Sequence, residues 1–294
     1  MNYNNFLKED IGRRDLTTQL IIPKDKIIKA VLLAKEPCVV CGMASARLVF
    51  KAQDSKIKFY PKVSDGNLVK KGAILAGIEG RAGSILTAER VALNFLSLLS
   101  GVATQTRRFV EAVRPYKVKI MDTRKTIPGL RELEKYAVRV GGGYNHRMRL
   151  DEMVLIKDNH LKVINPKSDG KVTLRLLRPF GARNDKCGVF QRYQIPKSIR
   201  VEIEVKNLKE FKEALKLKPD IIMLDNMSIK MMEDAVSLRN RLSTINYQPS
   251  TKLEASGGIS LKNVRKIAAT GVEMISVGAL THSVKSIDMS LEVL

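Results

Sequence analysis

The N-terminal part of the chain carries short apolar runs separated by turn residues. Two β-branched and apolar stretches, 26–34 and 37–40, are followed by a third at 57–60. The turn-forming sequences at 65–67 and 71–72 predict that the chain reverses between strands. A longer apolar stretch at 86–100 predicts a helix, with Thr87 as its N-cap and Gly101 as its end. The pattern therefore predicts a strand-rich unit with one apolar helix.

From residue 116 the pattern changes to strands that alternate with helices. Six short segments predict strands, at 118–121, 153–156, 201–205, 221–224, 252–255 and 273–277. Helical spacing follows most of them, and Asn207 and Ser228 are the expected N-caps of two helices. A further predicted helix at 130–140 ends in three glycines. This alternation predicts a parallel α/β sheet, open or closed into a barrel.

The residues that follow the predicted strands are charged, polar or glycine. They lie at 122–125, 157–160, 204, 225–226, 256–258 and 278. One polar residue after a strand more often just begins a loop, but six such strand ends favour a functional site. In a parallel barrel these ends meet on one face, where active sites form.

The charges at these positions indicate an anionic substrate, because lysine and arginine bind carboxylates and phosphates. The basic residues are Arg124, Lys125, Arg147 and Lys157. Glu204 and Asp225 follow consecutive strands, and such a pair is suited to hold Mg²⁺ jointly with substrate phosphates. The alternative is that both carboxylates form structural salt bridges with the nearby cations.

Glycines and one arginine add two weaker signals. Gly257, Gly258 and Gly278 precede predicted helix N-termini, where backbone N–H groups bind phosphate. Arg90 lies on a polar stripe of the apolar helix at 86–100, and a helix that is apolar nearly all round is expected to be buried. A buried Arg90 would need an anion beside it. That anion is either an internal acid such as Glu89 or a substrate carboxylate.

Composition limits the classes of protein. The chain has 294 residues, 44% of them hydrophobic, which predicts a folded protein of one large or two modest domains. Its formal net charge of +22 fits either a nucleic-acid partner or an enzyme for small anions. No five consecutive residues are basic and aromatic residues make up only 5%, which disfavours a base-stacking surface.

Targeting and cysteine signals predict a cytoplasmic protein. No apolar run reaches about 18 residues, so no membrane span is expected, and the N-terminal residues lack the apolar core of a signal peptide. Three cysteines cannot form a disulfide framework. The Cys38-Val-Val-Cys41 sequence fits strand packing better than a redox or zinc site, and the three histidines lack metal-binding spacing.

Several strings, in chain order, resemble the quinolinate phosphoribosyltransferase family, also called nicotinate-nucleotide pyrophosphorylase (carboxylating). They lie at 9–12 with 15–18, 87–90 with 93–94, 100–104, 122–126 with 128–129, 141–143 with 145–147, 157–160, 202–205, 224–226, 254–258 and 278–283. The resemblance covers nearly the whole chain, and the strings at 122–129, 145–147 and 157–160 are very specific. Two departures are Arg14, where the family's glycine is expected, and a long basic stretch at 161–199.

The resemblance implies a fold and an activity. The fold is a mixed α/β N-terminal domain at 1–115 and an incomplete seven-strand parallel α/β barrel at 116–283, with the tail at 284–294 packing back on the first domain. A short seventh strand would lie near 141–145. The activity is transfer of the phosphoribosyl group from phosphoribosyl pyrophosphate to quinolinate with Mg²⁺. The products are nicotinate mononucleotide, pyrophosphate and CO₂, in de novo NAD biosynthesis.

Two other functions stay open at this point. One is a phosphoribosyltransferase of the same fold with another acceptor, such as the molybdenum-transport-associated paralogue. The other is a basic nucleic-acid-binding protein that has kept the fold. The presence of Arg124, His146 and Arg147 favours a dicarboxylate acceptor over the acceptor of the related enzyme. Activity with quinolinate would separate all three functions.

The resemblance also implies roles for individual residues. The quinolinate carboxylates would be bound by Arg90, Arg124, His146, Arg147 and Lys157. The phosphoribosyl donor would contact Lys125 and Lys157, and Mg²⁺ would be held by Glu204 and Asp225; these four residues are the expected catalytic ones. The 5-phosphate end would be bound by Ser256, Gly257, Gly258, Gly278 and His282. Arg90 would act in the site of a partner subunit, which implies a homodimer or higher homo-oligomer with composite sites.

Overall fold

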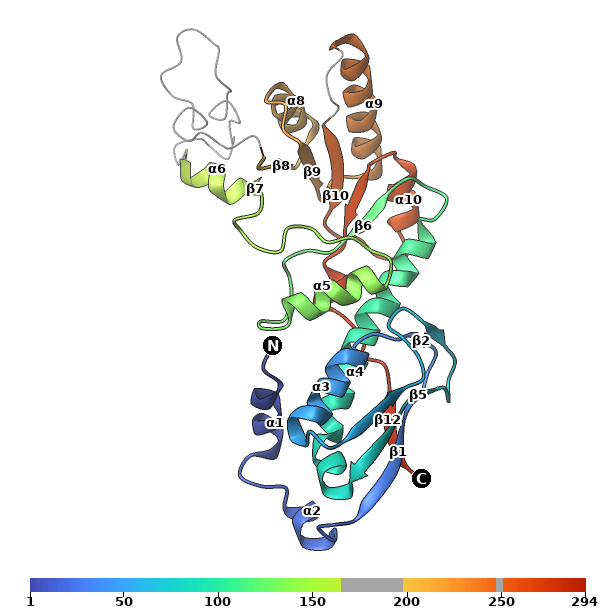
Figure 1. Cartoon of the computed structure of the whole chain (residues 1–294). Helices are drawn as coiled ribbons and strands as arrows, with labels where there is room; N and C mark the ends of the chain where they lie inside the picture. Colours follow the sequence, from blue (N-terminus) through green and yellow to red (C-terminus); the bar gives the residue numbers. More distant parts are fainter. Residues whose placement is uncertain (165–197, 247–250) are drawn as a thin grey trace. The chain divides into compact units, whose positions relative to one another are not determined.

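The computed structural model describes residues 1–164, 198–246 and 251–294 (Figure 1). The basic stretch at 161–199 thus lies mostly outside the described residues, as does Cys187. The chain divides into two compact units. Unit 1 comprises Met1–Arg108, Thr126–Gly143 and Leu280–Leu294, and unit 2 comprises Phe109–Lys125 and Tyr144–Ala279. The segment Thr126–Gly143 therefore packs with the N-terminal residues, although the expected domain boundary lay at 115–116.

Unit 1 is built on an antiparallel sheet in the order β12-β1-β5-β3 (Figure 1). Its strands are β1 (Ile27–Ala34), β3 (Lys58–Pro61), β5 (Ile74–Arg81) and β12 (Met289–Val293). The short strands β2 (Cys38–Val39) and β4 (Leu68–Val69) form a separate pair. β12 pairs with β1 from Ala30↔Val293 to Ala34↔Met289, so the C-terminal residues complete the sheet that the N-terminal residues begin.

Four helices and most of a fifth belong to unit 1. They are α1 (Tyr3–Ile11), α2 (Leu16–Ile21), α3 (Met43–Gln53), α4 (Ala82–Ala112) and α5 (Arg131–Val140). The pattern predicted α5 and part of α4 but not α1, α2 or α3. Local caps define the two helices nearest the N-terminus, because the side chains of Asn2 and Asp15 accept backbone amides of Asn4 and Thr18. Leu32, Phe50 and Leu96 are fully buried in the core of this unit.

Helix α4 is longer than the pattern predicted. It begins at Ala82 and continues through Gly101, so both the expected N-cap at Thr87 and the expected end at Gly101 are wrong. Thr87 instead donates its hydroxyl to the Asp15 carboxylate, at 2.9 Å. Gly101 is required by packing, since a Cβ there would lie 2.5 Å from the Lys285 carbonyl oxygen. By length and composition α4 could cross a membrane, but 61% of its most apolar window is buried inside the protein.

Unit 2 contains a parallel sheet in the order β6-β11-β10-β9-β8-β7 (Figure 1). Its strands are β6 (Lys119–Met121), β7 (Val154–Ile156), β8 (Val201–Val205), β9 (Ile221–Asp225), β10 (Lys252–Ser256) and β11 (Met274–Ser276). All six predicted strands are therefore confirmed. Tyr144 adds a single parallel bridge to Met121, at the place where the seventh strand was expected. The mixed α/β fold is thus as predicted, with a bridge in place of a full seventh strand.

Helices follow the strands of unit 2 as expected. They are α6 (Asp158–Ile164), α8 (Leu208–Lys216), α9 (Ile229–Asn246), α10 (Val264–Ala269) and α11 (Ala279–His282), whose last residues belong to unit 1. Both predicted N-caps are confirmed: Asn207 accepts the amides of Lys209 and Glu210, and Ser228 accepts the amide of Met231. These caps set where α8 and α9 begin, immediately after the strand ends.

The register of the parallel strands decides which side chains share a face. Paired residues of neighbouring parallel strands point the same way, and residues two apart on one strand also do so. The pairs Leu155↔Glu202 and Glu204↔Met223 place Glu202 and Glu204 on one face. The same rule adds Lys157, Asp225, Glu254 and Ser256 to that face. One face of the sheet therefore carries an unusual concentration of charge.

The two described cysteines are packing residues of unit 1. Cys38 and Cys41 are both buried, and the Cys41 amide donates to the Ser100 hydroxyl at 2.9 Å. Burial, with a smaller effect of the Glu36 charge, raises the pKa of the Cys38 thiol to about 11. A thiol with so high a pKa is protonated at neutral pH and is a poor nucleophile.

Candidate active site

Charged side chains meet at the carboxyl ends of β7, β8 and β9. Lys157 follows β7, and its Nζ lies 2.9 Å from Oε2 of Glu204 on β8. The Glu204 side chain is only 8% exposed, whereas that of Lys157 is 45% exposed. Asp225 ends the neighbouring strand β9 and is half-buried. The ion pair that the sequence left open as an alternative to metal binding is thus present for Glu204.

The loop after β10 is shaped by close contact with the end of β9. The Asn226 amide donates to the Ser256 carbonyl at 2.8 Å, and Ser256 pairs in register with Asp225. Gly257 and Gly258 have φ values of +89° and +61°. A Cβ on Gly257 would collide with the Asn226 side chain, so this position admits only glycine. The structure therefore places the expected phosphate-binding residues, at and just after the end of β10, beside the C-terminal end of β9.

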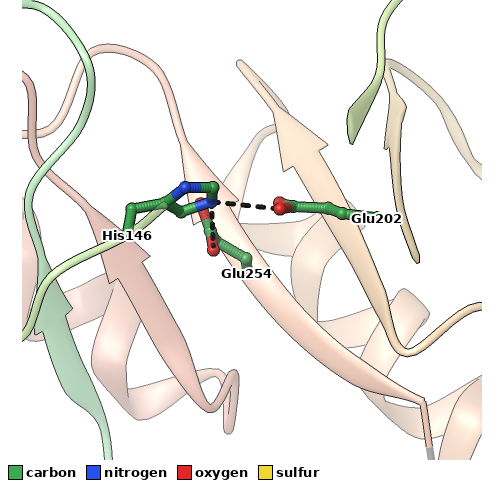
Figure 2. Close-up of side chains that lie close together, drawn as sticks. All are labelled: His146, Glu202 and Glu254. Carbon is green, nitrogen blue, oxygen red and sulfur yellow. Dashed lines mark hydrogen bonds and ion pairs between the residues drawn. The ribbon is translucent and has the colours of Figure 1, made fainter. Parts of the chain in front are cut away.

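A buried cluster lies on the same face of the sheet. Figure 2 shows the His146 imidazole directed at the carboxyl groups of Glu202 on β8 and Glu254 on β10. Its Nε2 lies 3.0 Å from Glu202 Oε2 and 3.7 Å from Glu254 Oε2. Both glutamates are fully buried, and the Ser276 hydroxyl donates to Glu254. We call these three residues, His146, Glu202 and Glu254, the buried triad.

The segment that carries His146 is fixed by buried hydrogen bonds. Asp122, fully buried at the end of β6, accepts the His146 amide at 2.9 Å and the Asn145 side-chain amide. The Arg147 amide donates to His146 Nδ1 at 2.9 Å, and Arg147 Nη1 donates to the Met153 carbonyl, also at 2.9 Å. Arg147 is therefore held from its backbone and from one end of its guanidinium group.

The electrostatics of this region favour binding of an anion. Burial lowers the pKa of the Arg147 guanidinium, and the positive charge of Arg124 lowers it further, while Glu202 opposes both effects. A substrate carboxylate close to Arg147 would favour the charged form of this guanidinium. Burial also raises the pKa of Glu254, and the charge of Glu202 adds to this effect. Glu254 is therefore expected to hold its proton well above the ordinary pH range of a glutamate.

Two of the expected substrate-binding residues lie in unit 1. Arg90 is on α4, and His282 ends α11 and is exposed, with its ring contacting the Ser283 hydroxyl. Arg90 is also exposed, so the expectation of a buried arginine is wrong. The reason is that the helix is not buried all round: Arg90 and Asn94 lie on an exposed stripe of α4. No hydrogen bond or ion pair of the described residues involves the Arg90 guanidinium.

Sequence reasoning missed the buried acids as members of the site. Glu202 and Glu254 appeared only within strings of the family resemblance, whereas Asp122 was also one of the residues at a predicted strand end. A usable signal was present for one of them, since Glu202 and Glu204 are two apart on a strand and so share a face. No comparable signal identified Glu254, because its partner His146 is distant in sequence.

Models of known families match both parts of the chain. Residues 15–100 match the quinolinate phosphoribosyl transferase N-terminal domain, and residues 102–292 match the C-terminal domain of the same family. The chain therefore belongs to the quinolinate phosphoribosyl transferase family, as its motifs indicated.

Named relatives agree with this assignment. The chain is 41% identical to a probable nicotinate-nucleotide pyrophosphorylase [carboxylating] of Methanocaldococcus jannaschii, over 98% of this chain and 94% of that protein. It is 38% identical to the protein so named in Synechocystis, over 98% of this chain and 90% of the relative. A solved nicotinate-nucleotide pyrophosphorylase from Ehrlichia chaffeensis has a TM-score of 0.86 at 36% identity, covering 99% of this chain and 97% of that chain.

Proposed function

We propose that this chain is a quinolinate phosphoribosyltransferase, a pentosyltransferase that acts in NAD biosynthesis. It joins the phosphoribosyl group of phosphoribosyl pyrophosphate to quinolinate and releases pyrophosphate and CO₂. The observation that carries this proposal is the nearness of two guanidinium groups: the charge of Arg124 lowers the pKa of Arg147. A cluster of this kind is matched by an acceptor with two adjacent carboxylates.

The acceptor is bound by fixed positive charge. Arg147 is anchored through Met153, and its Nε is buried without a hydrogen bond to a described residue. A substrate carboxylate supplies the missing acceptor for that N–H group. Arg124 lies close enough to affect the Arg147 pKa and shares the same anion. Lys157 adds a further positive charge and is held by its ion pair with Glu204.

The donor requires the carboxylates at the ends of β8 and β9. Glu204 and Asp225 offer oxygen ligands on neighbouring strands, so they would hold a hard cation such as Mg²⁺. Such a cation would supply charge neutralisation for the leaving pyrophosphate. Lys125 and Lys157 add fixed positive charge for the donor, and Ser256, Gly257, Gly258, Gly278 and His282 bind its 5-phosphate end.

The chemistry follows from positioning and charge rather than from a side-chain nucleophile. The quinolinate ring nitrogen forms a bond to C1 of the ribose as the bond from C1 to the pyrophosphate oxygen breaks. The nitrogen then carries positive charge. The bond between the adjacent ring carbon and its carboxylate breaks next, releasing CO₂. The electron pair stays on that carbon, is stabilised by the positive nitrogen, and takes up a proton.

The site is completed by a second subunit. Arg90 is exposed on unit 1 and has the charge needed to bind an acceptor carboxylate. In a homodimer or higher homo-oligomer, Arg90 enters the partner's site and binds that carboxylate. The enzyme works in the cytoplasm, where its buried cysteine thiols remain reduced.

The test is an assay of pyrophosphate release by the purified protein. Release is expected to require both quinolinate and phosphoribosyl pyrophosphate, with one CO₂ formed per pyrophosphate. Arg147→Met, which keeps the bulk of the side chain and removes its charge, is expected to abolish activity. This variant also excludes a contaminating enzyme. Release that proceeds without quinolinate, or without CO₂, would contradict the proposal.

A further inference from the structure

Among the described residues, two that are not glycine have a left-handed backbone: Lys218, with a φ of +51°, and Asn226, with a φ of +55°. Lys218 follows the end of α8, and its amide donates to the Leu215 carbonyl, as at many helix C-termini. Asn226 is different, because it directly follows the strand β9 and no helix ends there. A left-handed conformation that no helix end explains points to a role in the neighbouring site.

The Asn226 side chain lies against the backbone of Gly257. A Cβ on Gly257 would collide with the oxygen, carbon and nitrogen of the Asn226 side-chain amide. The backbone amide of Asn226 donates to the Ser256 carbonyl at 2.8 Å, so its backbone and its side chain contact the same stretch of chain. Asparagine suits this position, because its short polar side chain is one of the few that tolerate a positive φ.

The loop after β10 is held differently at its two ends. At the far end, Asn263 Nδ2 donates to the Gly258 carbonyl at 2.9 Å, and Asn263 Oδ1 accepts the Ser260 amide at 2.8 Å. At the near end, the backbone N–H groups of Gly257 and Gly258 make no hydrogen bond with described residues. Successive N–H groups of this kind bind anions, and the positive φ of both glycines sets where they point.

We propose that Asn226 is a positioning residue for the phosphoribosyl donor. Its side chain packs over Gly257 and holds the N–H groups of Gly257 and Gly258 in the direction that binds the 5-phosphate end. Asn226 is exposed, so truncating its side chain opens no cavity in the core, and its contribution is to the loop rather than to stability. This inference rests on the proposed function for the identity of the donor.

Kinetics of the Asn226→Gly variant test the role of the side chain. Glycine adopts a positive φ freely, so this variant keeps the left-handed turn and removes only the side chain. We expect the KM for phosphoribosyl pyrophosphate to rise by about tenfold or more, and the KM for quinolinate to stay within about twofold of wild type. Lys218→Gly, the same kind of change at the other left-handed residue, should leave both KM values unchanged. Denaturant unfolding of both variants should stay close to that of wild type.

A double variant tests the contact with Gly257. Gly257→Ala places a methyl group against the Asn226 side chain, whereas in an Asn226→Gly background that side chain is absent. The strain of alanine at a positive φ is common to both backgrounds. The factor by which Gly257→Ala raises the KM for phosphoribosyl pyrophosphate should therefore be smaller in the Asn226→Gly background. Equal factors in the two backgrounds would overturn the proposed contact.

Calorimetric titration of phosphoribosyl pyrophosphate separates this inference from the proposed function. The protein is titrated with Mg²⁺ and phthalate present, since phthalate is a dicarboxylate without the reacting ring nitrogen. We expect Asn226→Gly to bind the donor about tenfold or more weakly than wild type. Equal affinities, or a KM increase shared equally by both substrates, would overturn the positioning role. Donor binding that depends on Asn226, without any product from quinolinate, would support the positioning role and contradict the proposed function.

Discussion

Buried acidic residues are the most unusual single residues of this protein. Glu202, Glu254 and Asp122 are each fully buried, which is costly for a carboxylate that lacks donors. Asp122 receives backbone and side-chain donors, whereas Glu202 Oε1 and Glu254 Oε2 make no hydrogen bond with described residues. Buried ionisable groups whose oxygens lack hydrogen bonds are concentrated at functional sites.

The raised pKa of Glu254 predicts a specific dependence of stability on pH. The folded state keeps this carboxyl protonated, while the unfolded chain loses the proton near the ordinary value of 4.5. Stability associated with Glu254 is therefore fully present below that pH and falls as the pH rises above it. Glu254→Gln removes this loss, because the amide does not titrate.

Thermal unfolding of the two proteins checks this prediction. The Tm of Glu254→Gln relative to wild type should be higher at about pH 8 than at about pH 5. A Tm difference that does not depend on pH would show that Glu254 is ionised in the folded protein.

Asp225 is predicted to serve the donor side of the site. Asp225→Ala should raise the Mg²⁺ concentration that gives half-maximal activity, and the KM for phosphoribosyl pyrophosphate, more than the KM for quinolinate. Asp234→Ala is the matched control, since Asp234 is an aspartate on α9 paired with the exposed Lys230. Steady-state kinetics measure these three quantities. If the variant loses quinolinate binding while phosphoribosyl pyrophosphate binding stays intact, the assignment of Asp225 to the donor side of the site is wrong.

Individual site residues could be predicted where they lie at the end of a predicted strand. Lys157, Glu204 and Asp225 were found because each lies at the end of a predicted strand, and the structure places all three on one face of the sheet. The contact of His146 with Glu254 could not be predicted, because it joins a loop to a strand over a hundred positions away and depends on how the sheet closes. The burial of Arg90 was predicted wrongly from helix composition alone.

At the scale of elements, the regular alternation of strands and helices was easier to interpret than the residues at which a single helix begins or ends. The parallel strands of unit 2 were predicted to within two residues because each is a short apolar run with polar ends. Helices α1–α3 were missed because their apolar residues are few and their caps lie among other polar residues. Gly101 was taken as a helix end because glycine usually breaks helices, but here it provides space for the C-terminal segment.

Two glycines of α4 provide a test of this packing. Gly101→Ala should destabilise the protein by about 1–3 kcal/mol, because the new methyl group meets the Lys285 backbone. Gly83→Ala, in the same helix, should be neutral or slightly stabilising, because the nearest atom is a Thr18 methyl group at 3.2 Å. Denaturant unfolding measures both changes; equal effects would show that the tail does not pack against Gly101 in solution.

At the scale of the whole molecule, the distribution of site residues over two units matters more than net charge. Arg90 and His282 lie in unit 1, whereas the other expected substrate-binding residues lie in unit 2. The formal charge of +22 could not identify a partner by itself, because it fits nucleic acid and small anions equally. The partly buried position of Arg147, near both Arg124 and the buried Glu202, favours the small anion.

Subunit complementation tests whether Arg90 acts in a partner's site. Arg90→Ala and Lys157→Ala are each expected to be almost inactive. If the two variants exchange subunits at random in equal amounts, about a quarter of the sites should combine an intact Arg90 with an intact Lys157. Recovery near that level supports a composite site. If tagged subunits are shown to exchange and no activity returns, Arg90 serves its own chain.

The central claim is that the site selects an acceptor with two carboxylates, and the most direct measurement is kcat/KM for quinolinate against nicotinate in the same purified protein. Nicotinate lacks the second carboxylate and would satisfy less of the charge of Arg147, whose Nε is buried without a hydrogen bond to a described residue, and an unsatisfied buried donor is costly. We predict that quinolinate is preferred by about a hundredfold or more. Comparable values of kcat/KM for the two acceptors would contradict the account.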